Sequence, residues 1–123
     1  MTAERAQDLV ALGSRDYVGL EGFPNPGVAH VRMVSDELAA VCPITAQPDL
    51  YTATIEYRPG RLCLESKSLK LYLHGFRNEG VFAEALAVRI RDDVAAALEL
   101  PADAVTVTLV QRPRGGIEIT ATA

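Results

Sequence analysis

The sequence predicts one α+β domain, in which two strands are followed by two helices and then by two further strands. Apolar and polar residues alternate in the first part and at the end of the chain, whereas the middle repeats its apolar residues at helical spacing. A length of 123 residues with 49% hydrophobic residues suits a single core. We therefore expect residues 27–123 to form one domain, an antiparallel sheet with two helices on one face.

The first expected strands lie in residues 28–34 (VAHVRMV) and 50–57 (LYTATIEY), which are rich in β-branched and aromatic residues. The sequence RPGR at 58–61 predicts a turn, and residues 62–64 begin a return strand that would pair with the strand before it. Residues 1–26 end in GLEGFPNPG, whose prolines and glycines predict an irregular arm over the surface.

Two helices are expected in the middle of the chain. The first covers about residues 66–77, because four apolar residues there fall on one helical face: Leu69, Tyr72, Leu73 and Phe76. The second follows Gly80 and repeats apolar residues every three or four positions as far as Leu98, before LPAD ends it. The remaining segments, VTVTLVQR and GIEITATA around a PRGG turn, predict a second antiparallel pair.

Composition excludes several classes of function. A net charge of −4 argues against a nucleic-acid-binding protein, since such binding depends on clustered lysine and arginine. The N-terminal residues mix acids with bases and lack the apolar core of a secretory signal, and no apolar run is long enough to span a bilayer. We expect a cytoplasmic protein with a small-molecule ligand and no membrane partner. Two cysteines and two histidines, without metal-ligand spacing, predict neither a zinc site nor a structural disulfide.

The stretch CPITAQPD places Cys42 seven residues before Asp49. From the residues alone, Cys42 is either a small buried hydrophobic residue or a nucleophile with Asp49 as its proton partner. A nucleophilic role requires a neighbour that favours the thiolate, because a free thiol with a pKa of about 8.5 is mostly protonated at neutral pH.

Four stretches together resemble the QueF family of nitrile reductases, which belong to the tunnelling-fold (T-fold) superfamily. They are CPITAQPD, ESKSLKLYL, FRNEGVFAE and PRGGIEI, and the resemblance around them covers most of the chain from residue 20 onward. The resemblance implies a T-fold of order ββααββ and NADPH-dependent reduction of 7-cyano-7-deazaguanine (preQ0) to 7-aminomethyl-7-deazaguanine (preQ1), a step of queuosine biosynthesis for tRNA modification. Because each motif occurs once, the chain resembles the short, single-module form of the family.

The resemblance also implies roles for individual residues. Cys42 would add to the nitrile carbon to form a thioimidate, and Asp49 would deliver a proton to the nitrogen. The carboxylate of Glu84 would accept hydrogen bonds from a ring N–H and the exocyclic amino group of the deazaguanine. The other substrate contacts would be Leu64, Glu65, Ser66 and Ala83, and the contacts to NADPH would be Lys67, Lys70 and Arg114. The chain has no GxGxxG after a strand, so a Rossmann site is not expected.

The chain departs from the family pattern at one site position. Where the family has Phe-His-Glu, with the histidine near the nitrile, this sequence reads Phe82, Ala83 and Glu84. Asp49 with water could suffice, another group such as His74 could substitute, or the chemistry could differ. The alternatives to a reductase are a protein that forms an amidine with ammonia and a protein that only binds preQ0.

A small sheet with unpaired edges predicts assembly with further copies of the chain. The resemblance implies that the subunits close barrels with active sites at their interfaces. It also implies that two pentameric rings stack into a homodecamer.

Overall fold

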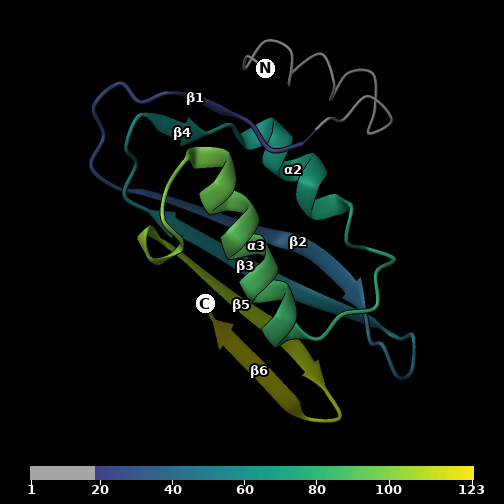
Figure 1. Cartoon of the computed structure of the whole chain (residues 1–123). Helices are drawn as coiled ribbons and strands as arrows, with labels where there is room; N and C mark the ends of the chain where they lie inside the picture. The colour runs from purple at the N-terminus through teal and green to yellow at the C-terminus, as the bar shows by residue number, and fades with distance from the viewer. Residues whose placement is uncertain (1–18) are drawn as a thin grey trace.

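The computed structural model describes residues 19–123 as an antiparallel four-stranded sheet covered by two helices (Figure 1). The strands follow the order β2-β3-β5-β6 in the sheet. Their bounds are Val31–Val41 for β2, Pro48–Tyr57 for β3, Val105–Arg114 for β5 and Ile117–Thr122 for β6. The predicted α+β class is thus confirmed. The greater part of the predicted irregular arm, residues 1–18, lies outside the described residues.

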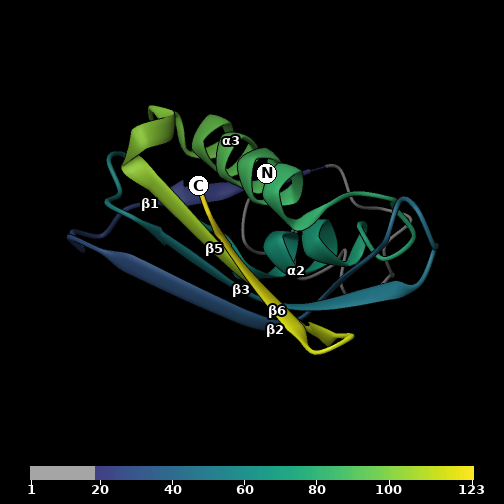
Figure 2. The ribbon, with the colours of Figure 1, turned by 90° about the horizontal axis from the view of Figure 1, so that it is seen from below.

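Both helices lie on one side of the sheet (Figure 2). Helix α2 spans Ser66–His74, and Gly75 is its C-cap. The helix therefore ends three residues before residue 77, where the pattern predicted its end. Helix α3 spans Ala83–Leu98, and its apolar stripe is fully buried against the sheet, with Leu86, Ile90, Val94 and Leu98 at most 1% exposed. A short 3-10 helix, η2 (Ala102–Ala104), leads into β5. No helix within residues 19–123 is both long and apolar enough to span a membrane.

Alternation along the central strands determines which residues face the helices. On β3 the buried residues are Tyr51, Ala53, Ile55 and Tyr57, and on β5 they are Val105, Val107 and Leu109. The same alternation also turns two polar residues inward, Asp49 on β3 and Gln111 on β5, which are 5% and 7% exposed. The helix-facing side of the sheet is therefore apolar except at the end where β3 begins and β5 finishes.

The first strand of the sheet differs from the prediction. Strand β2 begins three residues later than expected and continues to Val41, well past residue 34. A β-bulge between Ser35 and Leu38 interrupts its pairing with β3, and the acidic residues there break the alternation that would have revealed the strand in the sequence.

The partner of residues 62–64 was also predicted wrongly. Strand β4 (Leu62–Leu64) does not return along β3 but pairs with β1 (Gly22–Pro24), which lies within the segment expected to be irregular. Gly22 permits the close approach, because a Cβ at that position would lie 3.2 Å from the Cβ of Leu62. The edge of β3 that β4 was expected to occupy is taken by β5.

The Tyr57 hydroxyl fixes β4 to the end of β3, since it accepts a hydrogen bond of 2.7 Å from the buried N–H of Leu64. The substitution Tyr57→Phe leaves that N–H without its partner, and we expect it to lower the free energy of unfolding by about 1–3 kcal/mol. Chemical denaturation of the two proteins measures the difference. An unchanged unfolding midpoint would show that the hydrogen bond contributes nothing to stability.

Candidate active site

The segment that carries Cys42 leaves the end of β2 as a tight turn. The Cys42 N–H donates to the Gln47 carbonyl at 2.8 Å, and the Ala46 N–H donates to the Cys42 carbonyl at 2.8 Å. Ala46 adopts a left-handed conformation with φ of 59° to close the turn. This geometry returns the chain into β3 and brings the two ends of the CPITAQPD stretch close together.

Backbone hydrogen bonds tie this turn to the start of α3. The Val41 N–H donates to the Glu79 carbonyl at 3.0 Å, and the Val41 carbonyl accepts from the Val81 N–H at 3.1 Å. Helix α3 begins two residues after Val81, so Cys42 and the first turn of α3 lie at the same end of the sheet. That first turn contains the buried Ala83, which is 1% exposed, and the exposed Glu84.

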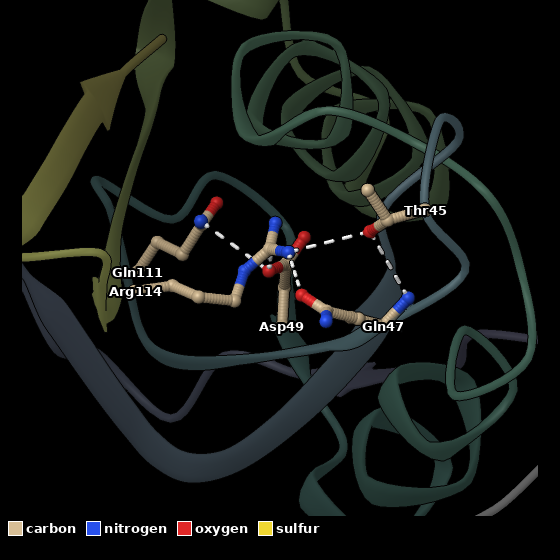
Figure 3. A network of polar contacts seen from close by, with 5 residues as sticks. All are labelled: Thr45, Gln47, Asp49, Gln111 and Arg114. Carbon is tan, nitrogen blue, oxygen red and sulfur yellow. Dashed lines mark hydrogen bonds and ion pairs between the residues drawn. The ribbon is translucent and has the colours of Figure 1, made fainter.

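Asp49 lies at the centre of a polar network at this end of the sheet (Figure 3). Its Oδ1 is 3.1 Å from Nη2 of Arg114 and accepts a hydrogen bond of 3.4 Å from Nε2 of Gln111. Nη1 of Arg114 also donates to Gln47 Oε1 at 2.5 Å and to Thr45 Oγ1 at 3.3 Å. One guanidinium from β5 therefore joins the Cys42 turn to the buried carboxylate of β3.

The same surroundings make Cys42 more acidic than a free thiol. Hydrogen bonds from the side chain of Thr45, and then from the backbone of Thr45 and Ile44, lower the pKa of Cys42 to about 7, with a smaller contribution from Arg114 and against the opposing effect of burial. The nearby thiolate and Asp49 raise the pKa of Arg114, so the guanidinium remains charged. A large fraction of Cys42 is therefore thiolate at neutral pH, as a nucleophile requires.

The remaining predicted site residues form a second group at the start of α2. Figure 1 shows that the end of β4 and the tip of β2 lie at opposite ends of the molecule. The backbone N–H of Leu64 is held by Tyr57. Both carboxylate oxygens of Glu65 cap α2, accepting from the N–H groups of Lys67 at 2.7 Å and Ser68 at 2.9 Å. A single chain thus brings Cys42, Asp49, Ala83, Glu84 and Arg114 to one end of the sheet, whereas residues 64–70 lie at the end of β4 and over the middle of β2 and β3.

The exposed face of α2 is the part of this group that suits an anionic ligand. Ser66 and Lys70 line a cavity of about 430 Å³ between α2 and β2. Lys67 lies on the same helix, three residues, or about one turn, before Lys70. Two ammonium groups three residues apart on a helix can contact one phosphate cluster. The carboxylates of Asp36 and Glu37 line the same cavity, so the lysines favour a phosphate only on the side away from β2. Arg114, which the resemblance groups with these lysines, contacts Asp49 instead.

Several residues of the site escaped the sequence analysis. Thr45 and Gln47 lie inside the CPITAQPD stretch, but nothing in the pattern shows that they contact Arg114. Gln111 carried a usable signal, because it is a polar residue that follows Val105, Val107 and Leu109 in the inward register of β5. Tyr51 carried the same signal on β3, two positions after Asp49. Among residues 19–123, no three His, Cys, Asp or Glu side chains are grouped so that they could hold a metal ion.

Comparison with known proteins identifies the relatives of this chain. A family model described as "QueF-like protein" matches residues 48–123. A protein of Frankia casuarinae named "NADPH-dependent 7-cyano-7-deazaguanine reductase" is 50% identical over 105 residues, which cover 85% of this chain and 82% of that protein. A protein of the same name from Anaeromyxobacter sp. (strain K) is 50% identical over 88 residues, covering 69% and 70% of the two chains.

A solved structure shares the fold. The crystal structure of the archaeosine synthase QueF-Like in the apo form matches with a TM-score of 0.72 and 28% sequence identity. The match covers 79% of this chain and 93% of that chain. The two helices and the antiparallel sheet are therefore shared with a protein related to the same family.

The Thr45 hydroxyl makes the largest contribution to the lowered pKa of Cys42. We expect Thr45→Val to raise the Cys42 pKa above 7 toward the value of a free thiol, and a rise of one unit lowers the thiolate fraction at pH 7 by roughly fivefold. The ultraviolet absorbance of the thiolate, followed against pH with Cys42→Ala as the blank, measures the midpoint. Thr106→Val, on an exposed position of β5, is the matched control. A midpoint that does not move in Thr45→Val would contradict the assignment.

Proposed function

Since the chain belongs to the QueF family, we propose that it reduces the nitrile of preQ0 to the primary amine of preQ1, in queuosine biosynthesis, with two molecules of NADPH. The observation that carries this proposal is the acidic Cys42 thiol, held in one network with Asp49 through Arg114 and Thr45. The relatives are named as NADPH-dependent oxidoreductases acting on the same nitrile, and they share half of their residues with this chain over the matched region.

In the first step, Cys42 adds to the nitrile carbon. The thiolate forms a carbon–sulfur bond as one π bond of the nitrile breaks, and the proton released when the thiol ionised is delivered through Asp49 to the nitrogen, which gives a thioimidate. Asp49 is suited to this transfer because it is 5% exposed and lies in the network that surrounds the Cys42 turn. The sulfur leaves when the carbon is reduced to the imine, and the free thiolate is restored for the next substrate.

Glu84, in the first turn of α3, would orient the substrate. Glu84 is exposed there, and no side chain caps the N-terminus of the helix, so a negative charge at this position is favoured by the helix dipole. A carboxylate with two free oxygens matches the two neighbouring donors of the deazaguanine ring. The tie between Val41 and residues 79–81 keeps this carboxylate at the same end of the sheet as Cys42.

NADPH supplies one hydride in each of the two reductions. Lys67 and Lys70 would hold its phosphates, since they present two cations on neighbouring positions of α2. Arg114 is engaged by Asp49 and by the Cys42 turn, so its principal role in a single chain is to order the catalytic network.

A complete site requires two copies of the chain. Within one chain, the end of β4 that leads into residues 64–70 lies apart from the tip of β2 that leads into Cys42, although the resemblance places both groups at one substrate. Strands β2 and β6 are the edges of the sheet and can pair with neighbouring copies. We propose that subunits join through these edges into the barrel of the T-fold superfamily, with two pentameric rings forming a decamer.

A second candidate function is amidine formation, in which ammonia rather than hydride attacks the thioimidate and displaces the Cys42 thiolate. Two observations favour it: Ala83 replaces the histidine of the family pattern, and the structural neighbour is titled an archaeosine synthase. Binding of preQ0 without turnover is the third candidate and rests on Ala83 alone. The intact ESKSLKLYL stretch with both lysines favours the reductase over either alternative.

Reductase activity predicts a fixed stoichiometry. With limiting preQ0, we expect two NADPH to be oxidised per nitrile, measured by the loss of NADPH absorbance and by mass spectrometry of preQ1. Cys42→Ala should lower the rate by at least about 10³-fold, because the thioimidate cannot form. Cys63→Ala, at the buried cysteine of β4, is the matched control. Consumption of ammonia with formation of an amidine, and no oxidation of NADPH, would establish the second candidate instead.

A shared site predicts complementation between inactive chains. We expect Cys42→Ala and the double variant Lys67→Ala/Lys70→Ala to be inactive alone and to regain activity when they are refolded together, because mixed oligomers contain sites with an intact thiol and intact lysines. Mixing Cys42→Ala with Asp49→Ala should restore nothing, since both residues belong to one chain's half of the site. Light scattering should report an oligomer, and an active monomer would contradict the proposal.

A further inference from the structure

Tyr51 carries a buried hydroxyl that has no hydrogen-bond partner in the described part of the chain. The residue is 0% exposed, in the middle of the helix-facing side of β3. A buried hydroxyl left without a partner costs about 1–3 kcal/mol, and phenylalanine would fill the same space without that cost. A tyrosine at this position therefore indicates a use for the hydroxyl that the free chain does not reveal.

Tyr51 lies beside the polar network of Asp49, Gln111 and Arg114, which indicates where its hydroxyl acts. It follows Asp49 by two residues on the same face of β3, and its partner across the sheet on β5 is Gln111. Gln111 in turn donates to Asp49 Oδ1 at 3.4 Å. Tyr51 is thus next to both members of the buried polar pair on which the proposed proton transfer depends.

Charges from two elements reach the Tyr51 hydroxyl. Burial is the main cause that raises the pKa of Tyr51 to about 12, and the negative charges of Asp49 and Glu84 raise it further, while Arg114 opposes them. The charges that act on the Tyr51 hydroxyl thus come both from Asp49 on β3 and from Glu84 on α3. At neutral pH its hydroxyl is protonated and can donate a hydrogen bond.

The first turn of α3 lacks a donor where one is expected. Ala83 is 1% exposed and belongs to the same packed core as Tyr51, but its methyl group cannot donate a hydrogen bond. The two histidines of the chain do not replace it: His74 is exposed in the last turn of α2, and His30 is exposed before β2 and lies 3.7 Å from Glu56. Tyr51 is the buried neutral donor available at this end of the core.

We propose that the Tyr51 hydroxyl donates a hydrogen bond to the nitrogen of the bound substrate and so takes the place of the histidine that Ala83 lacks. This inference rests on the proposed function, because it assigns Tyr51 to the nitrile-derived nitrogen. Cys42 and Asp49 are themselves only 8% and 5% exposed, so a substrate bound to them must enter the same covered end of the sheet, where Tyr51 follows Asp49 by two residues on the inward face of β3. The hydrogen bond stabilises the negative charge that develops on nitrogen as the thiolate adds.

The test compares Tyr51→Phe with the wild type. Because the hydroxyl has no partner in the free protein, thermal stability should stay the same or rise. In contrast, kcat/KM for preQ0-dependent NADPH oxidation should fall on the order of 100-fold, the usual effect of losing one donor to a developing charge. Formation of the Cys42 adduct with preQ0, followed by mass spectrometry, should slow in parallel. Tyr72→Phe, which removes a hydroxyl bonded to Asp93 at 2.6 Å between the helices, is the control expected to keep its kcat/KM.

A second pair of variants tests whether position 83 and Tyr51 serve one purpose. Tyr51→Ala removes the ring and opens space in the core, and adding Ala83→His places an imidazole donor beside it. We expect the double variant to recover adduct formation and turnover relative to Tyr51→Ala. If the larger change prevents folding, Tyr51→Phe alone decides.

The outcomes separate this inference from the proposed function. Wild-type turnover with an equal kcat/KM in Tyr51→Phe would overturn the role of Tyr51 and leave the reductase intact. If the wild type oxidises no NADPH, calorimetric titration with preQ0 decides: tighter binding by the wild type than by Tyr51→Phe supports the inference, whereas equal affinities, or no binding, overturn it.

Discussion

Two backbone hydrogen bonds of Val41 hold together the end of the sheet that carries the Cys42 turn and the start of α3. They join the last residue of β2 to residues 79–81, which lead directly into α3. Without that tie, the Cys42 turn and the first turn of α3 would be separate surface segments, each free to move relative to the other. Because the hydrogen bonds are between backbone groups, they fix the position of the Cys42 turn relative to Glu84 whatever side chains occupy the segment.

Residues of one turn and one arginine from a distant part of the sequence together lower the pKa of Cys42. Eight consecutive residues supply the thiol, the N–H and hydroxyl donors around it, and the carboxylate Asp49. Their shared cation, Arg114, comes from the far end of β5. One guanidinium therefore contacts both the Cys42 turn and the carboxylate of Asp49. Donors from one turn, with a smaller contribution from a cation on β5, are thus sufficient to lower the pKa of Cys42 to about 7.

Periodicity predicted the elements that bury a full face. The stripe of α3 and the strands at residues 50–57, 105–112 and 116–123 were expected from the sequence, because burial imposes a regular spacing on their apolar residues. Periodicity did not predict the pairing of strands that are distant in the sequence, since nothing near residues 62–64 indicates that they pair with residues 22–24. Cys42 and Asp49 could be named from their motif. The Arg114 contacts and the unpartnered Tyr51 hydroxyl could not, because a sequence pattern shows which face a residue occupies but not which atoms it meets.

The bulge between Ser35 and Leu38 has an effect far larger than its size. Pairing runs from Ser35 opposite Ala53 to Leu38 opposite Tyr51, so β2 contains one residue more than β3 over this interval. That extra residue shifts the alternation, so that Leu38, Ala40 and then Cys42 turn toward the helices. In an unbulged strand, the inward positions would fall on residues 37, 39 and 41, and the thiol would emerge on the opposite surface of the sheet. The bulge thus decides on which side of the sheet Cys42 lies: deleting one residue between Leu38 and Val41, with the bulge kept, would leave Asp49 facing the helices and turn Cys42 to the opposite surface.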